Sequence, residues 1–484
     1  MKVLFLNPPF RGKFSRTSRS PAITRGGTIY YPFWLAYAAG VLDKDSFEVT
    51  IIDAPAQGYD LEKTANEVKQ INPRLIVIDT STPSIYSDIK TAERLKNILP
   101  AVFIVLVGTH PSALPEETLK LSGKLDAVAK GEYDYTIRDL ARCLRDKGDL
   151  KKIDGLVFKE GNQIIFNHPR ALIENLDELP LVSQVYKKYF DIKKYFFAAA
   201  DYPMAMIITG RGCPFRCFFC VYPQTFHSRK YRFRSPKNVV DELEYIAKEL
   251  PEVKEVGIED DTFTANPQRT EEICRLIIQR KIKIKWYCNV RPNLAEETMI
   301  WMKKAGCQLV TVGFESASQP ILDNIHKGIK VAEIREFVKN TKKIGILVHG
   351  CFMAGNPGET KQTLEEMLKF AKELNCDTMQ FYPLQVYPGT EAYQWAKENN
   401  YLSTSDFSQW ATEGGGYNCL LNFPNLNAQD LINFCQQATK AYYLRLPYIL
   451  MKIKQLIFHP SEYRRTVRGA TAFFKTTFLA KNYK

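Results

Sequence analysis

The chain has 484 residues, of which 45% are hydrophobic and 25% are charged, and its formal net charge is +13. This chain is longer than an ordinary domain with a single hydrophobic core, so we expect two or three domains. No run of about 18 uncharged apolar residues argues for a membrane-spanning helix, and the polar N-terminal segment does not resemble a signal peptide. Eleven cysteines without disulfide-framework spacing predict a reducing, cytoplasmic location.

Positive charge concentrates in two segments of the chain. Residues 440–484 contain ten Lys or Arg and one acid, Glu462, whereas residues 11–25 contain five Lys or Arg and no acid. The remainder is about neutral. This distribution suggests anionic partners local to the two ends rather than a general nucleic-acid surface, so we expect no nucleic-acid partner.

Residues 1–148 alternate short apolar runs with amphipathic segments. We expect strands at 3–6, 49–53, 75–79, 102–107 and 126–129, and helices at 31–42, 59–71, 88–99, 115–122 and 135–145. Such alternation implies an α/β domain with a parallel, doubly wound sheet, whose ligand lies beyond the carboxyl ends of the strands. No G-x-G-x-x-G motif follows the first strand, which argues against a nicotinamide- or flavin-binding domain.

Small and polar residues follow these strands and are the candidate ligand contacts. They are Pro8, Asp53, Ser81, Thr82, Gly108, Thr109, His110, Gly131 and Glu132.

Residues 149–198 form a candidate linker with a small hairpin, and residues 199–400 contain six strand–helix units. We expect strands at 204–208, 254–258, 283–288, 309–313, 347–353 and 378–384. Six units suffice for a partial barrel of the (β/α)6 type, in which active groups lie at the carboxyl ends of the strands.

Three cysteines, Cys213, Cys217 and Cys220, follow the first of these strands in a C-x3-C-x2-C pattern. Thiolates bind iron–sulfur clusters, and a four-iron cubane normally takes four of them. Three cysteines can therefore hold three irons and leave one open. No fourth Cys or His stands at finger-like spacing, which argues against a structural zinc site. A disulfide would leave one thiol unpaired.

Further candidate contacts follow the later strands. They are Glu259, Asp260, Arg291, Glu315, Ser316, Gly355 and Pro357. A carboxylate at such a position suits an ammonium group, although an acid after a strand can also be a helix cap. Four other cysteines are expected in the core, namely Cys274, Cys307, Cys376 and Cys435, whereas Cys288 and Cys351 are ambiguous.

The cysteine motif resembles that of the radical S-adenosylmethionine (SAM) enzymes, which usually have an aromatic residue, here Phe219, before the third cysteine. The segments around Glu259 and Glu315, and the loop Gly355–Glu359, also resemble cofactor-contacting segments of that family. The resemblance implies a [4Fe–4S] cluster on the three cysteines, SAM on the open iron, and an external one-electron reductant of the flavodoxin or ferredoxin type.

The first section resembles the cobalamin-binding domain that precedes the radical domain in one class of these enzymes. Gly108-Thr109-His110 and Gly131-Glu132 are its most recognisable points. The D-x-H-x-x-G signature of the methionine-synthase type is absent, so we expect no histidine below cobalt. We then expect His110 to make a polar contact to the corrin or its tail, with an axial ligand to cobalt as the alternative. A degenerate domain that binds nothing is the other alternative.

The resemblance implies that the reduced cluster cleaves SAM to a 5′-deoxyadenosyl radical. The lead hypothesis is methylation of an unactivated carbon in a large, lipid-type or other apolar substrate, with a second SAM remethylating cobalt. A radical cyclase or rearrangement enzyme with the same cofactors is the main alternative. An iron–sulfur electron carrier or regulator would not need the cofactor-contacting segments. An RNA-modifying enzyme would need a basic barrel face.

Residues 401–484 are predicted to be mainly helical, with a helix at 428–443 and basic amphipathic segments at 448–458 and 460–475. Gly414–Gly416 is a candidate loop over the barrel mouth. The tail resembles those of radical enzymes that act on lipids, including hopanoid-associated members. Such segments either lie on an anionic membrane surface, at its cytoplasmic face, or cover the barrel as a solvated layer.

Overall fold

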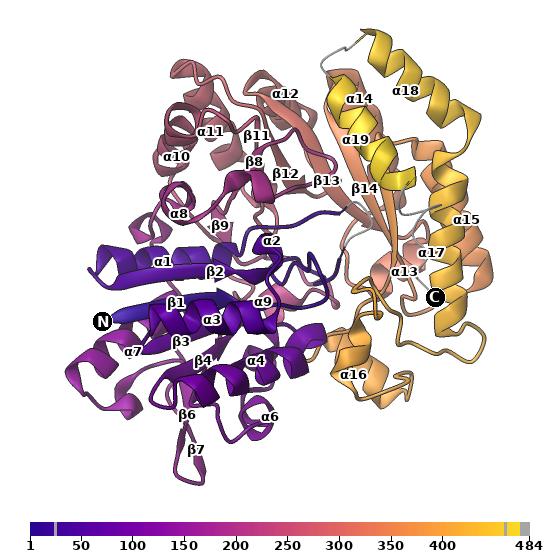
Figure 1. The fold of residues 1–484 in the computed structure, drawn as a ribbon. Helices are drawn as coiled ribbons and strands as arrows, with labels where there is room; N and C mark the ends of the chain where they lie inside the picture. Colours follow the sequence, from indigo (N-terminus) through magenta and orange to yellow (C-terminus); the bar gives the residue numbers. More distant parts are fainter. Residues whose placement is uncertain (24–26, 459–461, 475–484) are drawn as a thin grey trace.

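The computed structural model describes residues 1–23, 27–458 and 462–474. Two mostly parallel sheets, each packed against helices, organise the molecule, and a helical region follows them (Figure 1). The fold class predicted from the sequence is therefore confirmed.

The first sheet has the strand order β2-β1-β3-β4-β5-β6-β7. Its strands are β1 (Lys2–Asn7), β2 (Glu48–Asp53), β3 (Leu75–Asp79), β4 (Phe103–Val107), β5 (Ala127–Ala129), β6 (Leu156–Glu160) and β7 (Gln163–Phe166). The first five pair in parallel, whereas β6 and β7 continue the sheet as antiparallel strands. The hairpin expected in the linker thus extends the first sheet. The domain limits themselves remain a prediction.

Both faces of this sheet are covered, which explains why its strands are continuous apolar runs. Along β1, Val3 and Phe5 belong to one core and Leu4 and Leu6 to the other, as the period of two in a strand requires. Helices on the first face are α1 (Phe33–Lys44) and α7 (Asp134–Asp146). Helices on the second face are α3 (Leu61–Ile71), α4 (Ile85–Ile98) and α6 (Pro115–Lys120).

The second sheet is an open, six-stranded parallel sheet with the order β15-β14-β13-β12-β11-β8. Its strands are β8 (Met204–Ile207), β11 (Glu255–Ile258), β12 (Trp286–Val290), β13 (Cys307–Glu315), β14 (Leu347–Ala354) and β15 (Thr378–Pro383). Its main helices are α10 (Pro236–Glu249), α11 (Pro267–Gln279), α12 (Glu296–Lys304), α14 (Val331–Ile344) and α15 (Lys361–Leu374). These are the predicted strand–helix units, shifted by a few residues at their ends.

Shorter elements were not predicted. Among the described residues, they are α2 (Ala54–Gln57), α5 (Thr109–Ala113), α8 (Val182–Tyr189), β9 (Gly210–Arg211), α9 (Val221–Thr225), β10 (Arg232–Phe233), α13 (Gln319–Asn324), α16 (Glu391–Glu398) and six short 3₁₀ turns, including η1 (Thr82–Ser84) and η6 (Phe407–Trp410).

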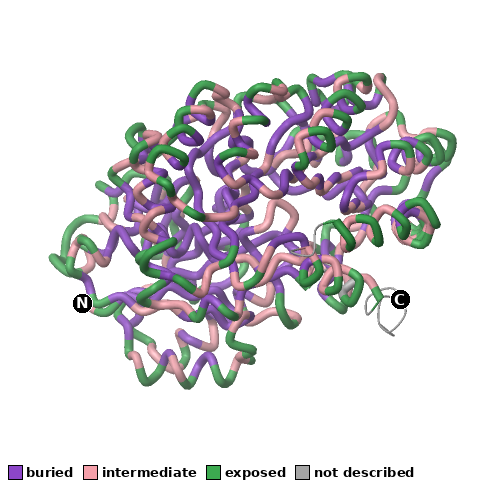
Figure 2. The backbone as a smooth tube through the Cα atoms, turned by 90° about the horizontal axis from the view of Figure 1, so that it is seen from above, coloured by how far each residue is buried: buried purple, intermediate pink, exposed green. Residues whose placement is uncertain are grey.

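Helix α1 joins the two sheets. The hydroxyls of Tyr31, just before it, and Tyr37, within it, donate to the backbone oxygens of Met204 and Ile208, at 2.9 and 3.0 Å. The first core runs on without a break into the barrel. Figure 2 shows buried residues running through the middle of the molecule and exposed residues mainly around its outside. The two sheets are therefore parts of one packed body.

The C-terminal region contributes α17 (Ala428–Tyr443), α18 (Leu446–Phe458) and α19 (Tyr463–Phe474). Tyr443 in α17 bonds to both backbone groups of Met379 in β15, at 2.8 Å each. The predicted segment at 460–475 lies partly outside the described residues. Within the described ranges, every helix is too short or too polar to cross a bilayer.

Candidate functional site

The three cysteines lie in the loop that follows β9, between β8 and α9 (Figure 1). Gly212, directly before Cys213, has φ +85°, and a Cβ there would lie 2.2 Å from the backbone oxygen of Lys230. Only glycine fits this turn. Cys213 and Cys217 are each 9% exposed, and Cys220 is half-buried. The loop therefore presents all three thiols from one short turn beyond the first barrel strand.

The thiols share one electrostatic environment. Burial, then the charge of Asp261, raises the pKa of both Cys213 and Cys220, and Cys217 adds to the effect at each. Arg291 Nη1 lies 3.8 Å from the Cys217 sulfur. Because thiolates are the metal-binding form, iron binding has to drive deprotonation here. No three Cys, His, Asp or Glu side chains in the described ranges converge on a single metal ion. In a cubane, each thiolate binds a different iron.

Glu315 ends β13 and faces the barrel mouth in an unusual backbone conformation. Its φ is +65°, which is costly for a residue with a side chain. Its carboxylate accepts from Lys327 Nζ at 2.8 Å and from the Tyr382 hydroxyl at 3.3 Å. A Cβ on Gly313 would lie 2.1 Å from Glu315 Oε1, so glycine is required for the side chain to fold back. Glu315 is thus held rigidly.

Glu259 and Asp260 follow β11 but point to different partners. Glu259 accepts from the Tyr287 hydroxyl at 2.9 Å and from Asn289 Nδ2 at 3.1 Å. Asp260 is fully buried and accepts from the amide and hydroxyl of Thr209, at 2.5 and 2.6 Å. Asp260 therefore fixes the start of the cysteine loop, while Glu259 remains at the barrel mouth.

The remaining predicted residues of the barrel surround the same mouth. Arg291 stacks on the ring of Phe215 at 3.7 Å, and Lys327 lies 5.9 Å from the Phe219 ring. Ser316 follows Glu315 and is fully buried. After β14, Gly355 has φ +96° and precedes Pro357 at the turn into α15. The structure thus brings the predicted barrel residues to the carboxyl ends of neighbouring strands.

Arg19 is a site residue that sequence reasoning missed. It donates to the backbone oxygens of Glu259 and Asp260, at 3.0 and 2.7 Å, and it lies 3.5 Å from the Glu259 carboxylate and 3.6 Å from that of Asp261. A cavity of about 20 Å³, the size of one water, adjoins it. The only sequence signal for Arg19 is its place in the basic segment at 11–25, whose charge instead predicts an anionic partner.

The prediction of an anionic partner at the N-terminal segment is wrong for most of its basic residues, because these residues already have partners within the chain. Arg16 is fully buried and pairs with Asp88 at 2.6 Å. Arg11 donates to the backbone oxygens of Ala411 and Thr412 in the loop that carries Gly414–Gly416. Arg25 lies outside the described residues. Arg11, Arg16 and Arg19 therefore bind the chain itself.

At the carboxyl edge of the first sheet, Gly108 has φ +114°, and a Cβ would lie 2.2 Å from the backbone oxygen of Thr80. Ser81 and Thr82, next along the chain, are buried in the η1 turn. Burial raises the pKa of Asp79, which ends β3, to about 7. This edge is therefore tightly packed and polar.

His110 is buried on the same edge. Its Nδ1 shares a hydrogen bond with the Thr82 hydroxyl at 3.2 Å, and its ring packs edge-on against Phe407 of η6 at 4.8 Å. Burial lowers its pKa to about 3, so the ring is neutral. These contacts show how the C-terminal region closes over the first sheet, whereas a contact from His110 to cobalamin stays a prediction.

Two predicted residues of the first domain have carboxylates that are already engaged. Asp53 accepts from the Tyr195 hydroxyl and from Asn7 Nδ2, both at 2.8 Å, and burial raises its pKa to about 6. Glu132 accepts from Arg232 Nη1 at 2.8 Å and lies 3.1 Å from His227. Both carboxylates therefore bind side chains from later parts of the chain, Tyr195 and Arg232. The other predicted residues at this edge are Pro8, which is buried, and Thr109 and Gly131, which are half-buried.

A buried ion pair joins this edge to the cysteine loop. Arg211, two residues before Cys213, donates to both oxygens of Asp134 at 2.7 and 3.1 Å and lies 3.6 Å from Glu132. Its side chain is 1% exposed. The position of the cysteines is therefore fixed partly by the first domain.

Buried polar atoms without a partner test whether the site suits polar ligands, because such atoms are rare in proteins. More than half of those among the described residues lie at the facing strand ends. They belong to Asp79, Thr80, Tyr133, Asp261, Arg291, Asn356, Glu359 and Tyr387. Burial raises the pKa of Glu359 to about 7. This donor and acceptor set, together with three thiols, fits a cluster and polar cofactors.

The spare cysteines lie elsewhere. Cys274, Cys307, Cys376 and Cys435 are buried in the core, as predicted. Cys288 is also fully buried, whereas Cys351 is half-buried in β14.

Comparison with known proteins agrees with this geometry. Residues 207–371 match the radical SAM superfamily, and residues 19–141 match the B12 binding domain. An uncharacterised methyltransferase of Pyrococcus horikoshii is 33% identical over 453 residues, covering 93% of this chain and 94% of the relative. The anaerobic magnesium-protoporphyrin IX monomethyl ester cyclase of Cereibacter sphaeroides is 26% identical, covering 85% of this chain and 66% of the cyclase.

A solved structure shares the fold. The radical SAM methyltransferase TsrM of Kitasatospora setae, solved with cobalamin and a [4Fe–4S] cluster, superposes with a TM-score of 0.70 at 17% identity, covering 92% of this chain and 88% of TsrM. The two domain matches and the relative from Pyrococcus show the family, and the solved structure shows the same fold. The chain belongs to the cobalamin-dependent radical SAM methyltransferases, whose cofactors are a [4Fe–4S] cluster, SAM and cobalamin.

Proposed function

We propose that this chain methylates an unactivated carbon of a large, mostly apolar substrate held at the barrel mouth. The observation that carries the proposal is the set of aromatic rings beside the two mouth carboxylates. Tyr287 donates to Glu259, and Tyr382 donates to Glu315. Phe197 packs on Tyr287 at 5.3 Å between ring centroids. Apolar ring faces next to charged groups suit an apolar substrate and a polar cofactor in the same space.

The chain's own residues would divide the work as follows. Cys213, Cys217 and Cys220 would hold the cluster, which with SAM supplies hydrogen abstraction from carbon, while cobalamin supplies the methyl group. Glu259 is a candidate partner for the ammonium group of SAM. Glu315 would orient SAM from its rigid pairing with Lys327.

Other predicted residues would complete the two cofactor sites. For SAM they are Phe219, Asp260, Arg291, Ser316, Gly355 and Pro357, with Asp260 acting through the cysteine loop. For cobalamin they are Pro8, Ser81, Thr82, Gly108, Thr109, His110 and Gly131, with Asp53 and Glu132 bracing the edge.

Radical SAM enzymes need a one-electron reductant and a small-molecule substrate. We expect the reductant to be of the flavodoxin or ferredoxin type. A lipid substrate and a peripheral position on the inner membrane face agree with the aromatic mouth and the basic C-terminal region.

The test is anaerobic reconstitution followed by turnover with SAM bearing a deuterated methyl group and a total bacterial lipid extract. Methyl transfer through this architecture should release 5′-deoxyadenosine and S-adenosylhomocysteine together, with label in the lipid fraction. A cyclase, the second candidate because a relative carries that name, would release 5′-deoxyadenosine alone. An electron carrier would release neither.

A substitution sharpens the test. Tyr417 packs against Tyr382 at 6.1 Å between centroids. Tyr417→Ala should lower methyl transfer about tenfold, because one ring contact is worth about 1.5 kcal/mol, while unproductive SAM cleavage persists. Tyr135→Ala, remote on α7, is the control. Equal loss of both reactions in Tyr417→Ala would contradict a substrate-binding role for the ring.

A further inference from the structure

Helix α18 has its polarity reversed relative to an ordinary surface helix, whose apolar face packs on the core. The residues that it turns inward hold Asp377, at the start of β15. The Tyr448 hydroxyl donates to the backbone oxygen of Asp377 at 2.8 Å, Gln455 donates to its carboxylate, and Lys452 lies 3.6 Å from it. The helix is therefore fixed to the barrel by polar contacts.

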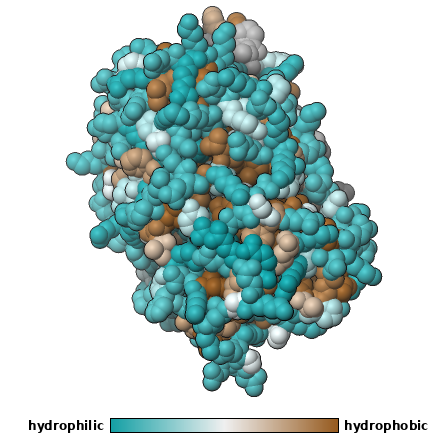
Figure 3. All heavy atoms as spheres, turned by 90° about the vertical axis from the view of Figure 1, so that its left-hand side faces the viewer, coloured by the Kyte–Doolittle hydropathy of each residue, from teal (hydrophilic) through white to brown (hydrophobic). Residues whose placement is uncertain are grey.

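Its outward face is apolar. The exposed residues recur at helical spacing: Leu446 (66% exposed), Ile449 (41%), Leu450 (48%), Ile453 (47%), Ile457 (66%) and Phe458 (74%). They form a single stripe at the outer edge of the molecule, where α18 lies in Figure 1. The opposite side, on the left of Figure 1, is mostly hydrophilic with scattered hydrophobic residues (Figure 3). Contiguous exposed apolar surface of this kind marks an interaction site.

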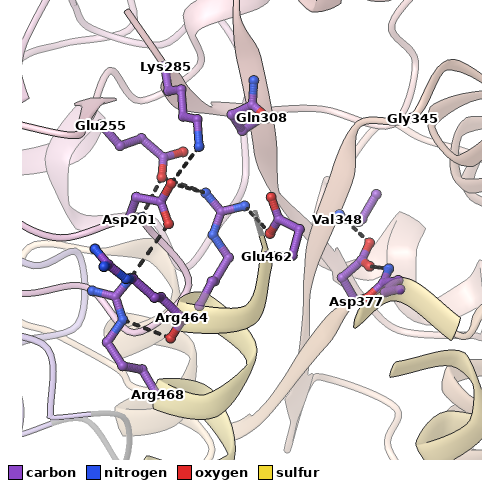
Figure 4. A network of polar contacts seen from close by, with 12 residues as sticks. Asp201, Glu255, Lys285, Gln308, Gly345, Val348, Asp377, Glu462, Arg464 and Arg468 are labelled. Atoms are coloured by element: carbon purple, nitrogen blue, oxygen red, sulfur yellow. Dashed lines mark hydrogen bonds and ion pairs between the residues drawn. The ribbon is translucent and has the colours of Figure 1, made fainter. Parts of the chain in front are cut away.

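Helix α19 repeats the pattern beside it. Arg465 points inward and bonds to Glu255 at 2.7 Å and to Glu462 at 2.8 Å. Figure 4 shows Glu255 with Asp201 and Lys285 at the base of the barrel, facing α19. Outward, Tyr463 is 60% and Val467 41% exposed. Charged side chains thus fasten both helices, and apolar side chains are left outside.

A basic groove of about 850 Å³ runs between α19 and the amino ends of β11 and β12. Five cations line it, with one acid, Asp201: they are Lys254, Lys283, Lys285, Arg464 and Arg468. Residues 440–484 as a whole carry ten Lys or Arg against Glu462. This charge opposes pairing with the same face of a second copy and favours an anionic surface.

We propose that the α18 stripe and the basic groove dock the protein on an anionic phospholipid bilayer, with α18 lying in the plane of the headgroups. The helix has 13 residues and is about 20 Å long, which is too short to span a hydrocarbon core of about 30 Å. An amphipathic helix with cations nearby is the form that lies in the interface.

The docking surface is at the amino ends of the barrel strands, whereas the cysteines lie beyond the carboxyl ends. Membrane binding is therefore a tether. It goes beyond the proposed methylation and does not depend on it, because the cysteine loop lies at the opposite ends of the barrel strands.

The experiment is sedimentation of the full chain, with and without a reconstituted cluster, with vesicles of phosphatidylcholine alone or mixed with phosphatidylglycerol. The wild type should bind the mixed vesicles. The variant Ile453→Ser/Ile457→Ser/Phe458→Ser should lose about a hundredfold in partitioning, because three inserted apolar side chains are removed. The charge variant Lys283→Glu/Arg464→Glu should bind the mixed vesicles more weakly than the wild type does. Its behaviour with vesicles of phosphatidylcholine alone should equal that of the wild type.

A control variant removes three exposed apolar residues of the same types elsewhere, in β7, α11 and α12. It is Phe166→Ser/Ile278→Ser/Ile300→Ser, at positions 51, 40 and 37% exposed, and it should bind like the wild type. Equal binding by the stripe variant and this control would overturn the proposal. The proposal would also be overturned if the full chain did not bind vesicles and a variant lacking residues 475–484 did. That result would identify the deleted segment as what covers the α18 stripe. A dimer that the stripe variant dissociates, without any vesicle binding, would assign the face to a second copy.

Discussion

The two basic segments of this chain both carry excess positive charge, but they have opposite structural roles. At residues 11–25, arginines turn inward: Arg16 pairs with Asp88, and Arg19 enters the barrel mouth. In α18 and α19, the charged residues that turn inward leave an apolar stripe and a basic groove outside. Charge density along a sequence therefore indicates where cations lie, but the acids brought to them by the fold decide whether they bind the protein or a partner.

The largest test of this contrast is Arg16→Met. Removing one member of a buried ion pair leaves an uncompensated charge, so the free energy of unfolding should fall by about 3–5 kcal/mol. Burial raises the pKa of Asp88 to about 6, so the loss should be smaller at pH 5, where Asp88 takes up a proton, than at pH 8. Urea denaturation measures both. Lys13→Met, exposed in the same segment, should change little. A loss as small as that of Lys13→Met would break the contrast.

The next test is Arg465→Met in α19. Arg465 is the basic residue of the C-terminal segment whose side chain points inward. Glu255, its partner, is fully buried, so we expect a loss of about 2–3 kcal/mol in the same assay. Arg464→Met, one residue earlier and exposed, is the matched control and should leave stability nearly unchanged. If the two variants behave alike, α19 is not fastened by its charged side chain.

The smallest effect concerns His110, on the edge that the first segment covers. The folded protein holds its pKa at about 3, whereas the unfolded chain has about 6.5. The unfolded chain binds the extra proton between these values, so stability is lost as pH falls through that window. Between pH 7 and pH 5 the loss from this group should be about 2 kcal/mol.

His110→Gln should abolish that share of the loss while keeping a hydrogen bond to Thr82. Denaturation curves at pH 7 and pH 5 check this. His326→Gln, at a histidine whose side chain is 60% exposed, should leave the wild-type difference intact. An unchanged difference in His110→Gln would mean that water reaches this edge.

Local patterns were enough to predict the strands of the two large sheets, most helices and the cysteine loop. Apolar runs such as Leu75–Asp79 are buried on both faces, and turn residues such as Gly108 and Gly212 follow strands because no other residue fits. The mouth residues Glu259 and Glu315 were found for the same reason, since parallel strands bring their carboxyl ends together.

Long-range pairings could not be predicted. Arg16 and Asp88 are 72 residues apart, and Arg19 meets Glu259 across 240 residues. Nothing local distinguishes these arginines from solvent-exposed ones. Likewise, the inward polar contacts of α18 are made with Asp377, 71 and 78 residues earlier in the chain.

The buried ion pair between Arg211 and Asp134 bears on whether the two domains of such a chain can be exchanged for those of another. The residue that braces the cysteine loop has its counter-ion in the B12 domain, so the two halves are not exchangeable cassettes. A hybrid that joins this barrel to a foreign cobalamin domain would strand a buried guanidinium beside the cluster unless the donor supplies acids equivalent to Glu132 and Asp134. Shuffling of cofactor modules within this lineage is constrained at that seam.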